Sequence, residues 1–307
     1  MSSPIVKRLC DFVDASPTAY HAVDSMAATL EARGARRLDE RAAWALEPGA
    51  AYFVVRSGSA LIAFRPGLRP PAEAGFAMAG AHTDSPALKA RLEKPLSGKG
   101  MERVAVEIYG GPIVSTWLDR PLALAGRVAL RAPSGGVESR LVNLARPVGV
   151  VPNLAIHLNR DINKGFEYNA QNHLPVLVAA TGEAAEAARE TAAEGGAASG
   201  ASASPAVAWP LALVARELGV EAAAVLGADL YFVEAQRVCA FGPEPELVNG
   251  PRLDDLVGCH AILEAFLDAP PAAHGQVACF LDNEEVGSRT IQGADSSFVR
   301  DLLGRVC

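Results

Sequence analysis

The stretch VACFLDNEEVGS at residues 277–288 joins a short apolar run to a turn that carries two adjacent carboxylates. An apolar run of this length, followed by a polar turn that contains glycine, predicts a buried strand ending at Leu281. Glu284 and Glu285 then lie where the strand stops. Burying unpaired carboxylates costs several kcal/mol each, so we expect these side chains to face water, meet cations or bind a metal ion.

The composition limits the classes of protein to which the chain can belong. Its 307 residues suffice for one large or two ordinary domains, and 50% hydrophobic with 21% charged residues is a globular balance. A net charge of -7 without a Lys- and Arg-rich cluster argues against nucleic acid as a partner. Five widely spaced cysteines without a CxxC pair predict reduced thiols and a cytoplasmic location. No signal-peptide core and no long apolar span is found, so we expect no membrane partner.

Hydrophobic periodicity predicts α/β character in both outer parts of the chain and a β-rich middle. The middle is rich in Val, Leu, Gly and Pro, and residues 195–204, which are all Ala, Gly or Ser, predict a loop. A second helix is expected to begin near Ser16-Pro17, with Ser16 as N-cap and Pro17 at the first helical position, and to end before Gly34. The other predicted helices span 4–14, 211–218, 254–266 and 296–303, and the predicted strands span 51–56, 60–65, 76–81, 104–109, 122–130, 140–144, 228–235 and 276–281.

A histidine and an aspartate follow the strand predicted over 76–81. In HTDSP at residues 82–86, His82 and Asp84 share one face of an extended strand end, because side chains alternate with period two. The Asp84 carboxylate could accept a hydrogen bond from one ring nitrogen and leave the other nitrogen to bind metal. The alternative is a structural histidine that is hydrogen-bonded within a turn.

Two further acidic pairs lie at element ends. Asp254 and Asp255 begin the helix after Pro251; capping of the free N–H groups explains one of them and leaves the other free to bridge two cations. Adjacent acids that leave a strand point in different directions, so one of Glu284 and Glu285 could bind metal while the other holds a water as general base.

A second histidine of interest lies in the middle part. His157 stands between apolar neighbours in NLAIHLNR, which is more typical of a core histidine, although the Asn- and Arg-rich flanks favour a functional role. One histidine, one aspartate and a glutamate pair form a ligand set suited to zinc or manganese. Two-metal hydrolases hold their ions with such carboxylates, one of which bridges the pair.

The motifs HTDSP (82–86), NLAIHLNRDIN (153–163), GPRLDDL (250–256) and DNEEVGS (282–288), with DASP at 14–17, closely resemble the aspartyl aminopeptidase family of cocatalytic zinc peptidases. The resemblance spans essentially the whole chain in the right order. It implies an α/β zinc-peptidase-like core, three-layered α/β/α with a mixed sheet, interrupted by a β-rich dimerisation or lid domain. We therefore expect the core over 1–92 and 242–307, the inserted domain over 93–241, and a dimer-based homo-oligomer that could extend to a dodecamer.

The resemblance also implies roles for single residues. His82 and Glu285 would bind metal, Asp254 would bridge, Glu284 would be the catalytic base, and Asp84 would be the partner of His82. His157 would contact substrate in the active site of a neighbouring subunit or act as a zinc ligand. Two zinc ions are expected, with manganese or cobalt as possible substitutes, and the substrates would be peptides with a free N-terminus, preferably Asp or Glu.

One departure from the family leaves two alternatives open. Family members continue beyond the position of Cys307, and that part carries a further Asp and a final His of the two-metal site, so we expect the chain to be C-terminally incomplete. The first alternative is an amidohydrolase or deacylase on the same core. The second is a catalytically impaired assembly subunit.

Overall fold

A computed structural model of the chain describes residues 3–180 and 209–307. The loop predicted at residues 195–204 lies outside the described residues. The chain divides into two compact units, which we call the core unit (residues 1–86 and 236–307) and the insert unit (residues 87–235). Each unit has a sheet and a hydrophobic core of its own, and each is described by itself.

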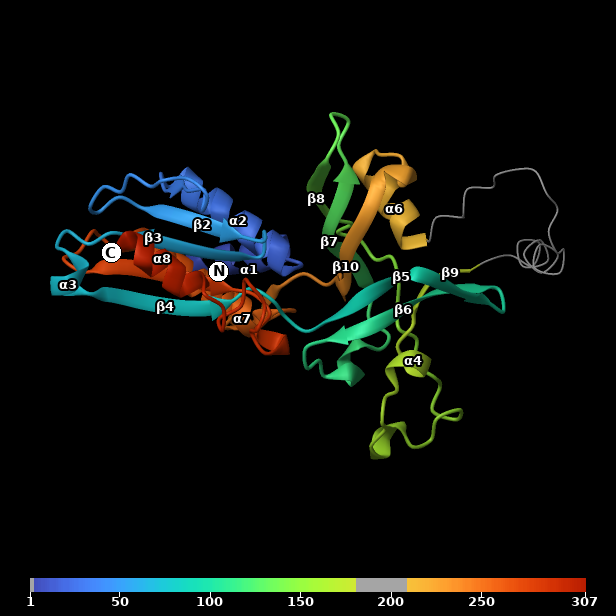
Figure 1. The fold of residues 1–307 in the computed structure, drawn as a ribbon. Helices are drawn as coiled ribbons and strands as arrows, with labels where there is room; N and C mark the ends of the chain where they lie inside the picture. Colours follow the sequence, from blue (N-terminus) through green and yellow to red (C-terminus); the bar gives the residue numbers. More distant parts are fainter. Residues whose placement is uncertain (1–2, 181–208) are drawn as a thin grey trace. The chain divides into compact units, whose positions relative to one another are not determined.

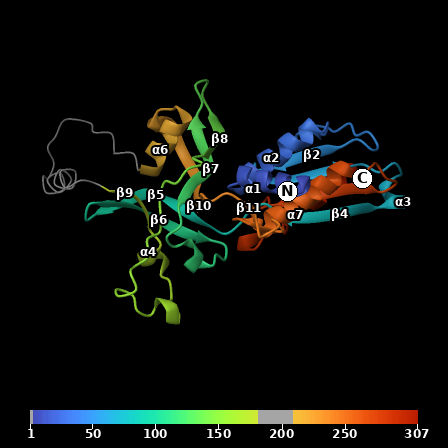
Figure 2. The same cartoon turned by 180° about the vertical axis from the view of Figure 1, so that it is seen from behind.

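The core unit contains a five-stranded sheet with helices on both faces (Figures 1 and 2). Its helices are α1 (Pro4–Ala15), α2 (Ala19–Ala32), α3 (Pro71–Ala74), α7 (Leu253–Asp268) and α8 (Phe298–Val306), with a 3-10 turn at Glu284–Val286. Its strands are β1 (Arg36–Arg37), β2 (Tyr52–Arg56), β3 (Ala60–Arg65), β4 (Phe76–His82) and β13 (Gly275–Leu281), with a separate ribbon of β11 (Cys239–Phe241) and β12 (Leu247–Asn249).

β13, the strand predicted to end at Leu281, lies inside this sheet. The strand order is β1-β2-β3-β13-β4, and β13 pairs antiparallel with β3 and parallel with β4. Alternate residues of β13 face opposite layers: Ala278 and Phe280 pack with α1, α2 and α7, whereas Val277 and Cys279 pack with α8. The predicted α/β class with a mixed, three-layered core is therefore confirmed.

The start predicted for the second helix is wrong. α2 begins at Ala19 with Thr18 as its N-cap, because the N–H of Ser16 donates to the carbonyl of Val13 and so closes α1. Ser16 is the C-cap of α1, and the first backbone hydrogen bond of α2 runs from Ala22 to Thr18. A serine before a proline signals a helix start only when the preceding helix does not use the serine to end.

The insert unit is built on a six-stranded antiparallel sheet in the order β8-β7-β10-β5-β6-β9. Its strands are β5 (Ala87–Gly98), β6 (Met101–Tyr109), β7 (Leu122–Arg131), β8 (Val137–Asn143), β9 (Val176–Ala180) and β10 (Val225–Glu234). Its helical segments are α4 (Ala170–His173), α6 (Trp209–Leu218) and 3-10 turns at Val114–Trp117, Ile162–Lys164 and Ala222–Ala224. None of the helices within the described ranges is both long and apolar enough to cross a bilayer.

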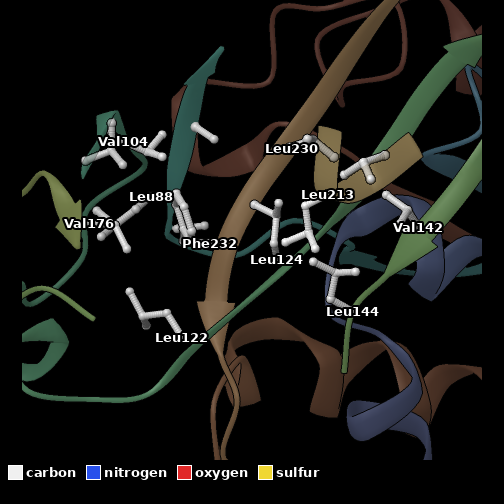
Figure 3. Close-up of a cluster of buried hydrophobic side chains, with 14 of the residues drawn as sticks. Leu88, Val104, Leu122, Leu124, Val142, Leu144, Val176, Leu213, Leu230 and Phe232 are labelled. Carbon is white, nitrogen blue, oxygen red and sulfur yellow. The ribbon is translucent and has the colours of Figure 1, made fainter. Parts of the chain in front are cut away.

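The larger hydrophobic cluster of the insert unit joins its sheet to α6. Leu88, Leu124, Leu230 and Phe232 from the sheet pack against Leu213 of α6, and all five are buried (Figure 3). Burial of an aliphatic or aromatic side chain contributes about 1.5–3 kcal/mol relative to exposure, so this cluster stabilises the sheet on the face that α6 covers.

The partly buried His21 of α2 should make the stability of the protein depend on pH. His21 accepts or donates a 2.8 Å hydrogen bond between Nδ1 and Thr18 Oγ1, and burial, followed by the charge of Arg252, lowers its pKa to about 4. Between pH 6.5 and pH 4 the unfolded chain binds a proton that the folded chain excludes, so stability falls as the pH is lowered. The effect amounts to about 2 kcal/mol between pH 7.5 and pH 5.

The measurement is the free energy of unfolding in urea at both pH values, for the unsubstituted protein and for His21→Gln. We expect the variant to lose the part of the pH dependence that His21 contributes. The same difference between the two pH values in both proteins would contradict the assignment.

Candidate active site

The candidate site lies where two neighbouring strands end. β4 and β13 run parallel, and their last residues, His82 and Leu281, are paired in register. Because parallel strands place their carboxyl ends at the same edge of a sheet, the residues after each strand meet there. Segments 82–86 and 282–288 are thereby brought together, and the start of α7 packs beside β4.

The imidazole of His82 has an acidic residue beside each ring nitrogen. Nδ1 lies 3.1 Å from the carbonyl oxygen of Asp84 and 3.4 Å from its carboxylate Oδ1. Nε2 lies 3.2 Å from Oδ1 of Asp254 and 3.9 Å from Oε2 of Glu284. The hydrogen bond with Asp84 raises the pKa of His82 to about 9, whereas burial acts in the opposite direction. Carboxylates beside both ring nitrogens suit either an imidazolium or, when the ring is neutral, a metal ion bound at one of the nitrogens.

Asp84 does more than face His82. Its side chain is only 4% exposed, and its two oxygens accept hydrogen bonds from the backbone N–H groups of Glu284 at 3.1 Å and Glu285 at 3.2 Å. The carboxylate therefore connects the end of β4 to the turn after β13 and fixes where both glutamates leave the backbone.

The two aspartates at the start of α7 have different surroundings. The Asp255 carboxylate accepts the N–H of Gly258 at 3.1 Å, so Asp255 is the capping acid. Asp254 presents a side chain that is 85% exposed and faces the His82 ring. Neither residue has helical backbone angles, and the peptide bond between them is cis. The regular helix therefore begins after Asp255, slightly later than the predicted start at residue 254.

The turn after β13 separates the two glutamates. Asn283 adopts left-handed backbone angles, and its N–H donates to Asp282 Oδ1 at 2.7 Å. Glu284 has a 59% exposed side chain that reaches toward His82, whereas Glu285 is half-buried. The adjacent acids thus have different environments.

Several residues that hold the site were not singled out from the sequence. Asp282 is 5% exposed, and burial raises its pKa to about 6. Cys259 donates its thiol hydrogen to the His82 carbonyl, and the Ser85 hydroxyl donates to the Asp254 carbonyl. The only sequence signal for Asp282 is that it is the first polar residue after an apolar strand, a position that usually faces solvent.

His157 belongs to the insert unit. It is exposed in a turn closed by a 2.8 Å hydrogen bond from the Leu158 N–H to the Ala155 carbonyl. The alternative of a core histidine is therefore wrong. Its apolar neighbours in the sequence, Leu154, Ile156 and Leu158, are 53–67% exposed as well.

The residues around His82 have the chemistry of a metal site, since imidazole nitrogen and carboxylate oxygens are the usual ligands of zinc. Asp84 on Nδ1 is the kind of outer partner that orients a ligating histidine. Within residues 3–180 and 209–307, no group of three or more His, Cys, Asp and Glu side chains is placed so that it could hold a metal ion. The side chains around His82 thus match a zinc site in residue type, but their positions in this structure do not form a set of ligands.

Comparison with known proteins gives a consistent result. A family profile described as aminopeptidase I zinc metalloprotease (M18) matches residues 12–307. The curated relative "Probable M18 family aminopeptidase 2" of Pseudomonas aeruginosa PAO1 is 43% identical over 314 residues, and that of Azotobacter vinelandii is 40% identical over 310 residues. Each alignment covers 100% of this chain and 67% of the relative.

Solved structures with the same fold include Ape4 in complex with Nbr1 and the mApe1 dodecamer of Saccharomyces cerevisiae. The Ape4 chain superposes with a TM-score of 0.89 at 32% identity, over 99% of this chain and 59% of that chain. The mApe1 chain superposes with a TM-score of 0.80 at 26% identity, over 99% of this chain and 66% of that chain. The chain thus spans about two thirds of its curated relatives and somewhat less of Ape4.

The difference in burial between Asp84 and Asp254 predicts different effects on stability. Asp84→Ala should lower the free energy of unfolding by about 3 kcal/mol, because two backbone amides lose a charged acceptor. Asp254→Ala should change it by less than about 1 kcal/mol, because an exposed ion pair contributes little. Urea unfolding followed by circular dichroism measures both values. Equal losses in the two variants would show that Asp84 does not hold the turn.

Proposed function

Because this chain belongs to the M18 family of zinc metalloproteases, we propose that its site is that of a metal-dependent aminopeptidase, which hydrolyses the first peptide bond of a peptide with a free N-terminus. The observation that carries this proposal is the meeting of the His82 ring with the Asp254 and Glu284 carboxylates beyond β4 and β13. Two strand ends and a helix start thus bring a histidine and two carboxylates together, the side-chain types with which two-metal hydrolases hold their ions and activate water.

The residues divide into ligands and a base. His82, Asp254 and Glu285 would hold two zinc ions, with Asp254 between them, and manganese or cobalt could substitute. Zinc, when bound, supplies a Lewis acid that polarises the scissile carbonyl and acidifies water. Glu284 would accept the proton of the attacking water, a task that suits its exposed carboxylate near His82 Nε2. Asp84 would keep the His82 ring in one orientation.

The substrate and the assembly are further parts of the proposal. A preference for N-terminal Asp or Glu requires an Arg or Lys in the pocket. The insert unit would mediate dimerisation or form a lid, and the exposed turn around His157 would reach the site of a neighbouring subunit, as substrate contact or ligand. A solved relative described as a dodecamer supports a dimer-based homo-oligomer. The cytoplasmic location stays a prediction from the sequence.

The roles of the two glutamates are tested by paired substitutions. Glu284→Gln should retain zinc and lose activity about 100-fold or more, because the base is removed while the ligands remain. Glu285→Ala should lose zinc. Zinc content by atomic absorption and hydrolysis of an Asp-peptide provide the two readouts. Loss of zinc in Glu284→Gln alone would exchange the two roles.

The reaction class is tested by the choice of substrate. We compare an Asp-peptide, a Leu-peptide and an N-acetyl-Asp peptide, each with added zinc. Cleavage of the free Asp-peptide in preference to the others is expected. Cleavage of the acylated substrate alone would indicate a deacylase, and no cleavage of any substrate with zinc bound would indicate a non-catalytic subunit.

The role of His157 is tested by mixing subunits. His157→Ala should lose activity, with zinc retained if His157 contacts substrate and lost if it is a ligand, and Glu284→Gln should also be inactive. If His157 acts in the site of a neighbouring subunit, mixed oligomers contain some sites in which Glu284 comes from a His157→Ala subunit and His157 comes from a Glu284→Gln subunit. Such sites have both residues intact, so the mixture recovers activity. Mixtures that stay inactive, although mass spectrometry shows mixed oligomers, would restrict His157 to its own subunit.

A further inference from the structure

We propose that Asp255 and Cys259 are positioning residues that hold the backbone of His82 and thereby set its ring against Asp254. We call the two hydrogen bonds between the His82 backbone and these side chains the α7 latch. The inference rests on the proposed function only in that His82 and Asp254 are taken as metal ligands. Neither latch residue contacts the His82 ring through any of these bonds.

The α7 latch contacts both backbone polar groups of His82, its N–H and its carbonyl. The His82 N–H donates to Asp255 Oδ2 at 3.3 Å, and the His82 carbonyl accepts the thiol of Cys259 at 3.1 Å. Asp255 caps the regular part of α7 through the Gly258 N–H, and Cys259 lies in the first regular turn that follows. The residue after β4, Thr83, donates its backbone N–H to the carbonyl of Leu281 in β13 instead. The backbone N–H and carbonyl of His82 therefore face α7, while the backbone N–H of Thr83 faces the sheet.

A third hydrogen bond joins the segment after β4 to the start of α7. The Ser85 hydroxyl donates to the backbone carbonyl of Asp254 at 3.0 Å. The segment after β4 and the start of α7 are thus joined at the backbone of each proposed ligand. The 3.2 Å distance between His82 Nε2 and Asp254 Oδ1 follows from how these two backbones are held.

The glycine at position 258 makes room for the latch. The Gly258 N–H donates to Asp255 Oδ1 at 3.1 Å, and a Cβ at this position would lie 2.2 Å from Oδ1 and 2.8 Å from Cγ of Asp255. The whole carboxyl group would have to move. Glycine in a helix costs about 1 kcal/mol relative to alanine, so by helix propensity alone the chain would be more stable with alanine here.

Substituting Gly258 by alanine tests the latch, because alanine favours the helix but displaces the Asp255 carboxylate. Gly258→Ala should weaken zinc binding about tenfold or more, the usual effect of losing an outer partner, because the Asp255 carboxyl leaves the His82 N–H. Its melting temperature should change little, since the loss of the Asp255 cap, about 1 kcal/mol, offsets the gain from alanine in a helix. The matched control is Gly304→Ala in α8, where a Cβ would meet no atom within 4 Å, and its zinc affinity should be unchanged.

Two readouts are needed. Zinc affinity is measured by competition with a chromophoric chelator, and amide hydrogen exchange across residues 81–84 is measured in the zinc-free protein. We expect faster exchange at His82 in Gly258→Ala and unchanged exchange in Gly304→Ala.

A second pair of variants tests the Cys259 thiol. Cys259→Ser, which keeps a hydrogen-bond donor, should retain more zinc affinity than Cys259→Ala.

The outcomes separate the latch from the proposed function. Unchanged zinc affinity in Gly258→Ala overturns the inference, and so does weakened zinc binding with unchanged exchange at His82. If the unsubstituted protein binds no zinc, the proposed function fails, and the exchange comparison in the zinc-free protein still decides whether Asp255 holds the His82 N–H.

Discussion

The buried carboxylate of Asp84 is the contact on which the rest of the site depends. It accepts the N–H groups of Glu284 and Glu285 and lies beside Nδ1 of His82, so it links both strand ends and one proposed ligand. A neutral side chain there would leave two amides without a charged acceptor in a place that is 4% exposed. The same charge raises the pKa of His82, which makes the geometry and the electrostatics of the site parts of one arrangement.

The strands that carry the site could be predicted because each is a short apolar run that ends in polar residues. β13 and β4 begin and end within one residue of the predicted bounds. The facing of His82 and Asp84 also follows from the alternation of side chains in an extended segment. The bonds from Asp84 to the turn after β13 could not be predicted, because they join residues 200 positions apart and depend on which strands are neighbours in the sheet.

The sequence does not determine which of the two aspartates at the start of α7, Asp254 or Asp255, is the capping acid. Capping predicts that one of Asp254 and Asp255 binds backbone N–H groups and the other is free, but the pattern does not say which. The structure decides it through Gly258, whose missing side chain leaves space for the Asp255 carboxylate alone. His157 is a different case, since a role in a neighbouring subunit is a relation between chains that the sequence of one chain does not specify.

The two buried cysteines mark the two faces of the core sheet. Cys259 packs in the layer with α1, α2 and α7, and Cys279 packs in the layer with α8, whereas Cys239 and Cys307 are exposed. Burial raises the pKa of Cys279 to about 11 and also raises that of Cys259. Because only thiolates react readily, alkylating reagents label these two positions when the layer over each has opened. The molecule therefore carries one chemical reporter of local opening on each side of its sheet.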